Sequence, residues 1–341
     1  MRTLTRRELN RALLARQLLL ERGRMPLPEA LERIAGLQAQ YAPAMYIGLW
    51  SRLEGFEREA LTEALEQRTV VQATLMRSTI HLVSPADFWP FALAIRAARR
   101  TSWGRGHKEL TAPAMAGAAR TLRRWLDGKK ILSRREIEEL VGKDRARGVG
   151  LWLDMVRVPP SGTWERRRAD LYAAAEHWLG PPDVDVAEAT EHLVRRYLAA
   201  FGPASRKDVA SFTGIAPATL APVITRLELR AFRSEDGDEL LDVPGGPLPD
   251  ADTAAPPRFL PTWDANLLVH ARRTGVLPEE HRAKIFNTKN PHSFPTFLVD
   301  GAVAGTWKHE RGRIALEPFG RLDAASRRAL REEGDRLAAL F

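Results

Sequence analysis

The sequence predicts a helix-rich α+β fold, because three helices followed by a β-hairpin recur in the same order three times before a β-rich tail. This order of elements is typical of a winged helix-turn-helix unit. We therefore predict three such units in tandem, then a small β module with a closing helix. The predicted units are residues 1–90, 91–182 and 183–245, and the C-terminal β module with its helix is residues 255–341.

The third unit has the clearest pattern. Apolar residues at helical spacing run through "AEATEHLVRRYLAAFG", and "SRKDVASFTG" predicts a short helix that is capped by Ser205 and closed by Gly214. "APATLAPVITRL" predicts a third helix with Pro217 near its start. The turn "EDGD" between "ELRAFRS" and "ELLDV" then predicts a hairpin.

The first two units repeat this order. In the first, helices are predicted over 5–22, 27–37 and 57–67, and "VVQATLM" and "TIHLV" predict strands around Arg77-Ser78. In the second, the predicted helices are "AMAGAARTLRRWLDG", "SRREIEELVG" and "ARGVGLWLDMV", with strands near "RVPP" and "WERRR". The copies share little sequence, so the prediction of a repeat rests on the order of elements.

The tail follows the Pro- and Gly-rich linker "VPGGPLPDADTAAPP". "FLPTWDANLLV", "TFLVDGAVAGTWKHE" and "RIALEPF" predict strands, with Asp300-Gly301 as a hairpin turn. "DAASRRALREEGDRLAALF" predicts a closing amphipathic helix that begins after Asp323.

Composition limits the classes of function. The 341 residues include no cysteine, which excludes disulfides and thiolate metal sites, and no run of about 18 apolar residues that would span a membrane. We expect a cytoplasmic, nucleoid-associated protein. The eight histidines lack metal-binding spacing and no Gly-rich phosphate loop occurs, so neither a metal nor a cofactor is predicted. Lys and Arg number 52 against 43 Asp and Glu, a net charge of +9 that favours a polyanionic partner.

The predicted recognition helices do not favour the reading of bases. "EREALTEALEQ" in the first unit has four glutamates, which phosphates would repel, and the third hairpin carries a run of acidic residues. Basic residues gather elsewhere, in groups that we interpret either as solvated faces or as DNA contacts. Three basic groups beside three DNA-associated folds favour a scaffold that holds DNA without reading its sequence.

Two glutamines separated by one alanine, Gln38 and Gln40, stand out in a chain with only five glutamines. They lie in "RIAGLQAQYAPAMYIGLWSRLEGF", which together with "VVQATLMRSTIHLVSPADF" resembles the N-terminal unit of the bacterial AlkZ/YcaQ-type DNA glycosylases. "FLPTWDANLLVHARRTGVLP" and "PTFLVDGAVAGTW" resemble that family's C-terminal region. The resemblance covers most of the chain and is weakest from about Trp103 to Ser161.

The resemblance implies tandem winged-helix units around a C-shaped DNA channel, and excision of bulky alkylated purines, with some members unhooking interstrand crosslinks. The family's catalytic motif is Gln, an aliphatic or similar residue, then Gln or Asp, and Gln38-Ala39-Gln40 matches its double-glutamine, AlkZ-like branch. The implied partner is duplex DNA with alkylated purines, bound by a monomer, since repeated units around one channel need no partner subunit. Candidates for DNA contact are Arg77, Thr79, His81, Arg96, Arg99, Arg100, Arg157, Arg272, Arg273, Lys308 and Arg313.

Neutral amides suit the chemistry of such a lesion. A glutamine is no general base, but its oxygen can hold a water and stabilise a nearby cation. An N7-alkylated purine is already cationic and departs readily, whereas an undamaged base needs protonation or a stronger base. The pair must lie on extended backbone to share a side, because residues i and i+2 of a helix do not face each other.

Three readings of the whole sequence compete. No lysine stands near the glutamine pair, so the first is a monofunctional glycosylase without a Schiff-base lyase step. The second is a non-catalytic DNA-binding protein, either a regulator or a damage-recognition factor, in which the pair is two exposed amides at a helix end. The third is a set of winged-helix units that serve protein association only.

Overall fold

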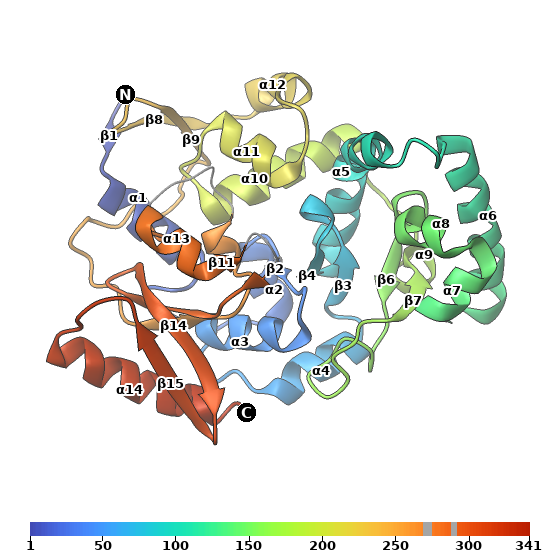
Figure 1. The fold of residues 1–341 in the computed structure, drawn as a ribbon. Helices are drawn as coiled ribbons and strands as arrows, with labels where there is room; N and C mark the ends of the chain where they lie inside the picture. Colours follow the sequence, from blue (N-terminus) through green and yellow to red (C-terminus); the bar gives the residue numbers. More distant parts are fainter. Residues whose placement is uncertain (269–274, 288–291) are drawn as a thin grey trace.

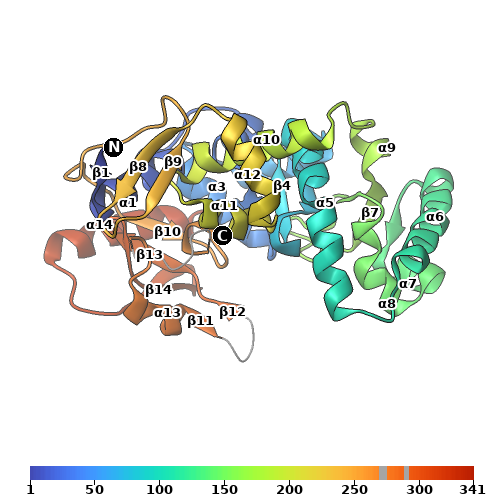
Figure 2. The same cartoon turned by 90° about the horizontal axis from the view of Figure 1, so that it is seen from above.

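The computed structural model describes residues 1–268, 275–287 and 292–341 and mixes helices with four antiparallel or mixed sheets (Figure 1). Figures 1 and 2 agree that one group of helices lies at the opposite end of the molecule from the C-terminal sheet and helix. The former group comprises α6 (Ala112–Lys129), α7 (Arg134–Val141) and α8 (Lys143–Gly148). The latter comprises β14 (Ala302–Glu310), β15 (Arg313–Pro318) and α14 (Ala324–Ala338).

The first 90 residues contain more elements than the sequence pattern predicts. Their elements are β1 (Thr3–Leu4), α1 (Arg6–Arg16), α2 (Leu27–Arg33), β2 (Leu37–Gln38), α3 (Ala42–Arg52), α4 (Arg58–Glu66), β3 (Val71–Thr74) and β4 (Ile80–Val83). The predicted helix ends at residues 22 and 37 are wrong, because left-handed backbone at Leu18 (φ 57°) and at Ala35 (φ 57°) follows α1 and α2. Strand β2 and helix α3 were not predicted, while both hairpin strands are confirmed.

The long helix α5 (Pro85–Gly106) runs from the first 90 residues into the next 92. Strand β5 (Leu132–Ser133) lies between α6 and α7. After α8 come η2 (Val149–Leu151), β6 (Met155–Arg157), β7 (Leu171–Ala174) and α9 (Ala175–Leu179). The prediction of a strand at "WERRR" is wrong. That segment belongs to a loop in which the Gly162 N–H donates to the Arg166 carbonyl and Ser161 Oγ accepts from the Asp170 N–H.

The helices and strands predicted between residues 183 and 245 are all present. They are α10 (Val186–Phe201), α11 (Arg206–Thr213), α12 (Pro217–Arg226), β8 (Arg230–Ser234) and β9 (Glu239–Asp242). Ser205 accepts a hydrogen bond from the Asp208 N–H in a capping box, and Gly214 closes α11 in the left-handed conformation (φ 72°).

The tail is partly as predicted. It contains β10 (Arg258–Leu260), η3 (Ala265–Leu267), α13 (Glu279–Ile285), β11 (Phe286–Asn287), β12 (His292–Ser293) and β13 (Thr296–Val299), followed by β14, β15 and α14. The turn at Asp300 (φ 49°) and Gly301 (φ 79°) and the Asp323 cap are confirmed. The predicted strand at "FLPTWDANLLV" is confirmed only as far as Leu260, because Asp264 caps the turn η3.

The two N-terminal hairpins meet in one six-stranded sheet with the order β2-β4-β3-β6-β7-β5. Strand β3 pairs antiparallel with β6 across the predicted boundary at residue 90, and β1 pairs parallel with β8 of the third unit. The tandem winged-helix layout, its channel and the four unit boundaries stay predictions.

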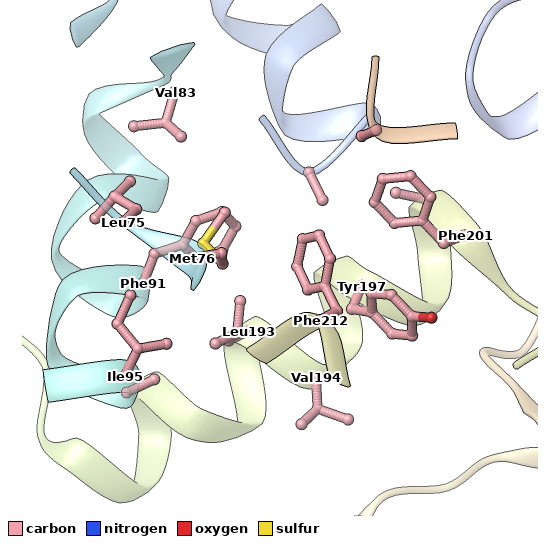
Figure 3. Packing of buried hydrophobic residues seen from close by; sticks show 14 of the residues in the cluster. Leu75, Met76, Val83, Phe91, Ile95, Leu193, Val194, Tyr197, Phe201 and Phe212 are labelled. Atoms are coloured by element: carbon pink, nitrogen blue, oxygen red, sulfur yellow. The ribbon is translucent and has the colours of Figure 1, made fainter. Parts of the chain in front are cut away.

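The tip of the β3–β4 hairpin is anchored in the largest core. Figure 3 shows Leu75 and Met76 lying among apolar side chains of α5, α10 and α11, such as Phe91, Leu193 and Phe212. Met76 and Phe91 are fully buried. The hairpin tip, which follows Met76, therefore has a well-packed base.

Within the three described ranges, every helix is too short or too polar to cross a membrane.

Candidate active site

Gln38 lies at the end of β2, the edge strand of the six-stranded sheet, and Gln40 lies two residues beyond it. Strand β2 pairs antiparallel with β4, with Gln38 directly opposite His81, and the Ala39 N–H donates to the Ile80 carbonyl at 2.7 Å. Gln38 is only 5% exposed, whereas Gln40 is exposed. The interpretation of two solvated amides at a helix end is therefore wrong for Gln38, which is buried and lies on a strand.

Both amide oxygens bond to the same hairpin. Gln38 Oε1 accepts from Arg77 Nη2 at 3.0 Å, and Gln40 Oε1 accepts from the Ile80 N–H at 3.2 Å. A carbonyl oxygen has two lone pairs, so each amide oxygen can accept one further hydrogen bond. The hairpin thus orients both amide oxygens and leaves each of them able to accept another hydrogen bond.

Arg77 occupies the turn between β3 and β4 in a strained backbone conformation. Arg77 (φ 53°) and Ser78 (φ 58°) are both left-handed, which is uncommon for residues other than glycine. The Arg77 guanidinium carbon lies 5.3 Å from the ring centre of Phe212 on α11, and its Nη1 is buried without a hydrogen-bond partner. Burial lowers the pKa of Arg77 below its usual value.

His81 is a neutral group beside the pair. It is 2% exposed, and its Nδ1 lies 3.1 Å from the Thr79 carbonyl oxygen, which can only accept, so Nδ1 carries the proton. Burial, reinforced by the charges of Arg77 and Arg99, lowers the pKa of His81 to about 3. The Thr79 hydroxyl donates to the Met76 carbonyl. Contact of His81 or Thr79 with DNA stays a prediction.

Three of the arginines predicted to contact DNA, on α5 and β6, bond to other groups of the protein. Arg96 pairs with Asp154 at 2.6 Å, and Arg100 donates to the Leu151 carbonyl. Arg157 donates to Thr74 Oγ1 at 3.0 Å, and burial lowers its pKa. Burial, together with the nearby charge of Arg157, also lowers the pKa of Arg99 to about 10, so Arg99 remains charged at neutral pH.

Other predicted contacts lie elsewhere. Lys308 and Arg313 belong to the separate C-terminal sheet, where Lys308 pairs with Glu317 at 2.6 Å and Arg313 is exposed. Arg272 and Arg273 lie outside the described residues. The structure therefore brings Gln38, Gln40, Arg77, Thr79 and His81 together, with Arg99 and Arg157 nearby, and leaves Lys308 and Arg313 in another sheet.

Comparison with known proteins identifies the family. The family model described as DNA glycosylase AlkZ-like matches residues 31–340, which include both glutamines and nearly the whole chain. The chain belongs to the AlkZ-like DNA glycosylase family. No curated protein matches it.

A solved structure shares the fold of this AlkZ-like chain. The Streptomyces sahachiroi DNA glycosylase AlkZ is 20% identical, and the match has a TM-score of 0.84 and covers 99% of this chain and 97% of that chain. The expected resemblance to the AlkZ-like family is confirmed.

Sequence reasoning missed two residues beside the site of this AlkZ-like protein. Phe212 lies under Arg77 but reads as an ordinary apolar residue of α11, and Asp154 is the nearest carboxylate to the arginines of α5. Neither residue lies in a motif, so their positions follow only from the packing of distant elements.

Within the described ranges, His, Asp and Glu form no group of three that could hold a metal.

Proposed function

We propose that this chain is a monofunctional DNA glycosylase that hydrolyses the N-glycosidic bond of bulky or crosslinking N7-alkylpurines in duplex DNA, with Gln38 and Gln40 as its catalytic residues. One observation carries the proposal. Gln38 at the end of β2 and Gln40 just beyond it both bond to the β3–β4 hairpin, in a chain that matches the family. An oriented pair of neutral dipoles is what an already activated leaving group requires.

The reaction needs no strong base. The bond between sugar C1′ and purine N9 breaks, and its electron pair passes to the purine, which neutralises the cationic alkylated ring. The sugar is left with oxocarbenium character. A water oxygen then bonds to C1′, and the proton that it loses passes to solvent. The product is an abasic site and a neutral alkylpurine.

The glutamine pair acts on this sugar and water. A free lone pair on an amide oxygen of the pair can accept a hydrogen bond from the attacking water, and that dipole stabilises positive charge at C1′. Because the two side chains are already bonded to the hairpin, little reorganisation is needed during the reaction. Weak catalytic groups also give selectivity, since a neutral, undamaged base departs too slowly to be excised.

The arginines of α5 and β6 provide a surface for phosphates. Arg96, Arg99 and Arg100 lie near one carboxylate, Asp154, whose charge offsets only one of theirs. The Nε atoms of Arg99 and Arg157 are buried without partners. A desolvated positive charge that has no counter-charge favours the binding of a phosphate beside it.

The test is single-turnover excision on a duplex with one N7-alkylguanine, with abasic sites counted against a protein-free reaction. Gln38→Ala and Gln40→Leu should each slow excision roughly 10²-fold or more, the scale for loss of one preorganised polar group. Gln40→Asp should retain activity, because a carboxylate also accepts from water and stabilises the sugar cation. DNA affinity should change little in all three variants, because contacts between basic side chains and phosphates supply most of it.

A matched control separates catalysis from general loss of an amide. Gln67 is an exposed glutamine at the end of α4, and Gln67→Ala should excise at the parent rate. If Gln38→Ala and Gln40→Leu are folded and also excise at the parent rate, the catalytic assignment is wrong. If the parent protein binds DNA but forms no abasic sites, the chain is a non-catalytic DNA-binding protein.

A further inference from the structure

We propose that Arg77 is a positioning residue, which orients the amide of Gln38 so that its Nε2 hydrogens, and not its oxygen, are the primary contact with bound DNA. This inference rests on the proposed function of Gln38. It replaces the expectation that Arg77 contacts DNA directly and assigns different roles to the two glutamines.

The orientation of Gln38 follows from hydrogen-bonding chemistry. A guanidinium group only donates, so the Gln38 atom that lies 3.0 Å from Arg77 Nη2 is the oxygen. The amide is planar, and its nitrogen therefore points away from Arg77. Gln38 is 5% exposed, so the side chain has little room to take another orientation.

Arg77 is itself held firmly. The turn that carries it is closed by the Leu75 N–H, which donates to the Thr79 carbonyl at 2.9 Å, and Met76 in the same turn is fully buried. The face of Phe212 supports the guanidinium at 5.3 Å. Among the described residues no carboxylate forms an ion pair with Arg77, so no strong acceptor competes with Gln38 for its donors.

The two amide oxygens differ in what they can still accept. Gln38 Oε1 bonds to a cation, which withdraws electron density and makes its second lone pair a weaker acceptor. Gln40 Oε1 bonds to the neutral N–H of Ile80, and Gln40 is exposed. Gln40 is therefore the better acceptor for the attacking water, while the polarised Gln38 amide is the better donor. Phosphate and sugar oxygens of DNA are suitable acceptors for the N–H groups of Gln38.

A double-mutant cycle tests whether Arg77 acts through Gln38. Single-turnover excision on one N7-alkylguanine duplex would be measured for Gln38→Ala, Arg77→Met and the double variant. We expect Arg77→Met to lose about 10-fold or more, the scale of a hydrogen bond to a charged group. In the Gln38→Ala background, Arg77→Met should cost less than about threefold. If the losses in rate of the two single variants multiply in the double variant, the inference is wrong.

Gln38→Glu tests the donor role while Arg77 stays in place. A carboxylate would pair with Arg77 but has no hydrogen to donate, so we expect a loss of about 10-fold or more, whereas Gln40→Asp remains active. Parent-rate excision by Gln38→Glu would show that Gln38 acts as an acceptor and would overturn the proposal. This arm also remains decisive if Arg77→Met does not fold.

DNA binding separates positioning from phosphate contact. For Arg77→Met, the slope of log affinity against log salt should equal that of the parent, whereas a slope weaker by about one would mean a phosphate contact and refute the inference. Arg24, an exposed arginine paired with Glu54, offers the control Arg24→Met, with parent rate and slope. If Gln38→Ala excises at the parent rate, the proposed function is wrong. If Gln38→Ala is slow but Arg77→Met excises at the parent rate, only the inference about Arg77 is wrong.

Discussion

At the scale of single residues, His81 couples the candidate site to pH. Its pKa in the folded chain is about 3, against about 6.5 in an unfolded chain. Between these values the unfolded chain binds a proton that the folded chain does not, so stability falls as the pH drops from 6.5 toward 3. Above pH 6.5 this contribution no longer changes with pH.

The corresponding prediction concerns His81→Gln, which removes the titrating group. Between pH 7.5 and pH 5, the parent should lose about 2 kcal/mol more unfolding free energy than the variant. Urea denaturation of both proteins at the two pH values measures the difference. All other titrating groups are common to both proteins, so their contributions cancel in the comparison. Equal losses in the two proteins would mean that His81 titrates normally.

At the scale of elements, close backbone packing limits the C-terminal sheet. Gly305 lies on β14 between β13 and β15, and an added Cβ would lie 2.4 Å from the Phe297 ring and 2.5 Å from the Glu317 carbonyl oxygen. A methyl group at Gly305 therefore has to displace both a buried ring and a neighbouring strand.

We predict that Gly305→Ala destabilises the protein by about 1–3 kcal/mol, the usual cost of overpacking. Gly320→Ala is the matched control, because an added Cβ there meets no atom within 4 Å. The midpoint of urea denaturation should shift for the first variant and stay close to the parent for the second. Equal midpoints for Gly305→Ala and the parent would show that the sheet adjusts without cost.

Local signals explain which elements could be predicted. Helix α11 was predicted correctly because its cap at Ser205 and its stop at Gly214 are encoded next to it. Helix α3 was missed because ten of its eleven residues are buried, which removes the polar face that a helical period needs. Strand β2 has only two residues, Leu37 and Gln38, too few for an alternating pattern.

The same limit applies to the candidate site. The glutamine pair was found because it forms a short motif within a recognisable region. The bond from Arg77 to Gln38 joins residues 39 positions apart, and Phe212 comes from still further along the chain. Only the pairing of β2 with β4 and the packing of α11 bring these groups together. No single-sequence pattern contains that information.

At the scale of the whole molecule, buried ion pairs join the first unit to both later parts of the chain. Arg16 of α1 pairs with Asp242 of β9 at 2.6 Å, and Arg52 of α3 pairs with Asp264 at 3.0 Å. All four side chains are at most 1% exposed. Breaking such a pair leaves an uncompensated buried charge, so the unit that carries Gln38 is held tightly from two sides.

The distribution of charge over the molecule predicts how it binds undamaged DNA. The net charge is +9, yet α4 and the β8–β9 hairpin are acidic, while Arg99 on α5 and Arg157 on β6 have buried Nε atoms without hydrogen-bond partners. Those arginines suit phosphates, which are the same for every sequence. We therefore predict binding to undamaged duplex that is independent of sequence.

This binding should also weaken steeply with salt. If Arg99, Arg100 and Arg157 each neutralise one phosphate, log affinity should fall against log salt with a slope of about −3 or steeper. Fluorescence anisotropy on two unrelated duplexes between low and high salt measures both features. Arg157→Met should weaken binding equally on both duplexes and reduce the slope by about one, because it removes one phosphate contact and no base contact. A footprint at one defined sequence that persists at high salt would instead favour a regulator, since base contacts depend far less on the release of counterions.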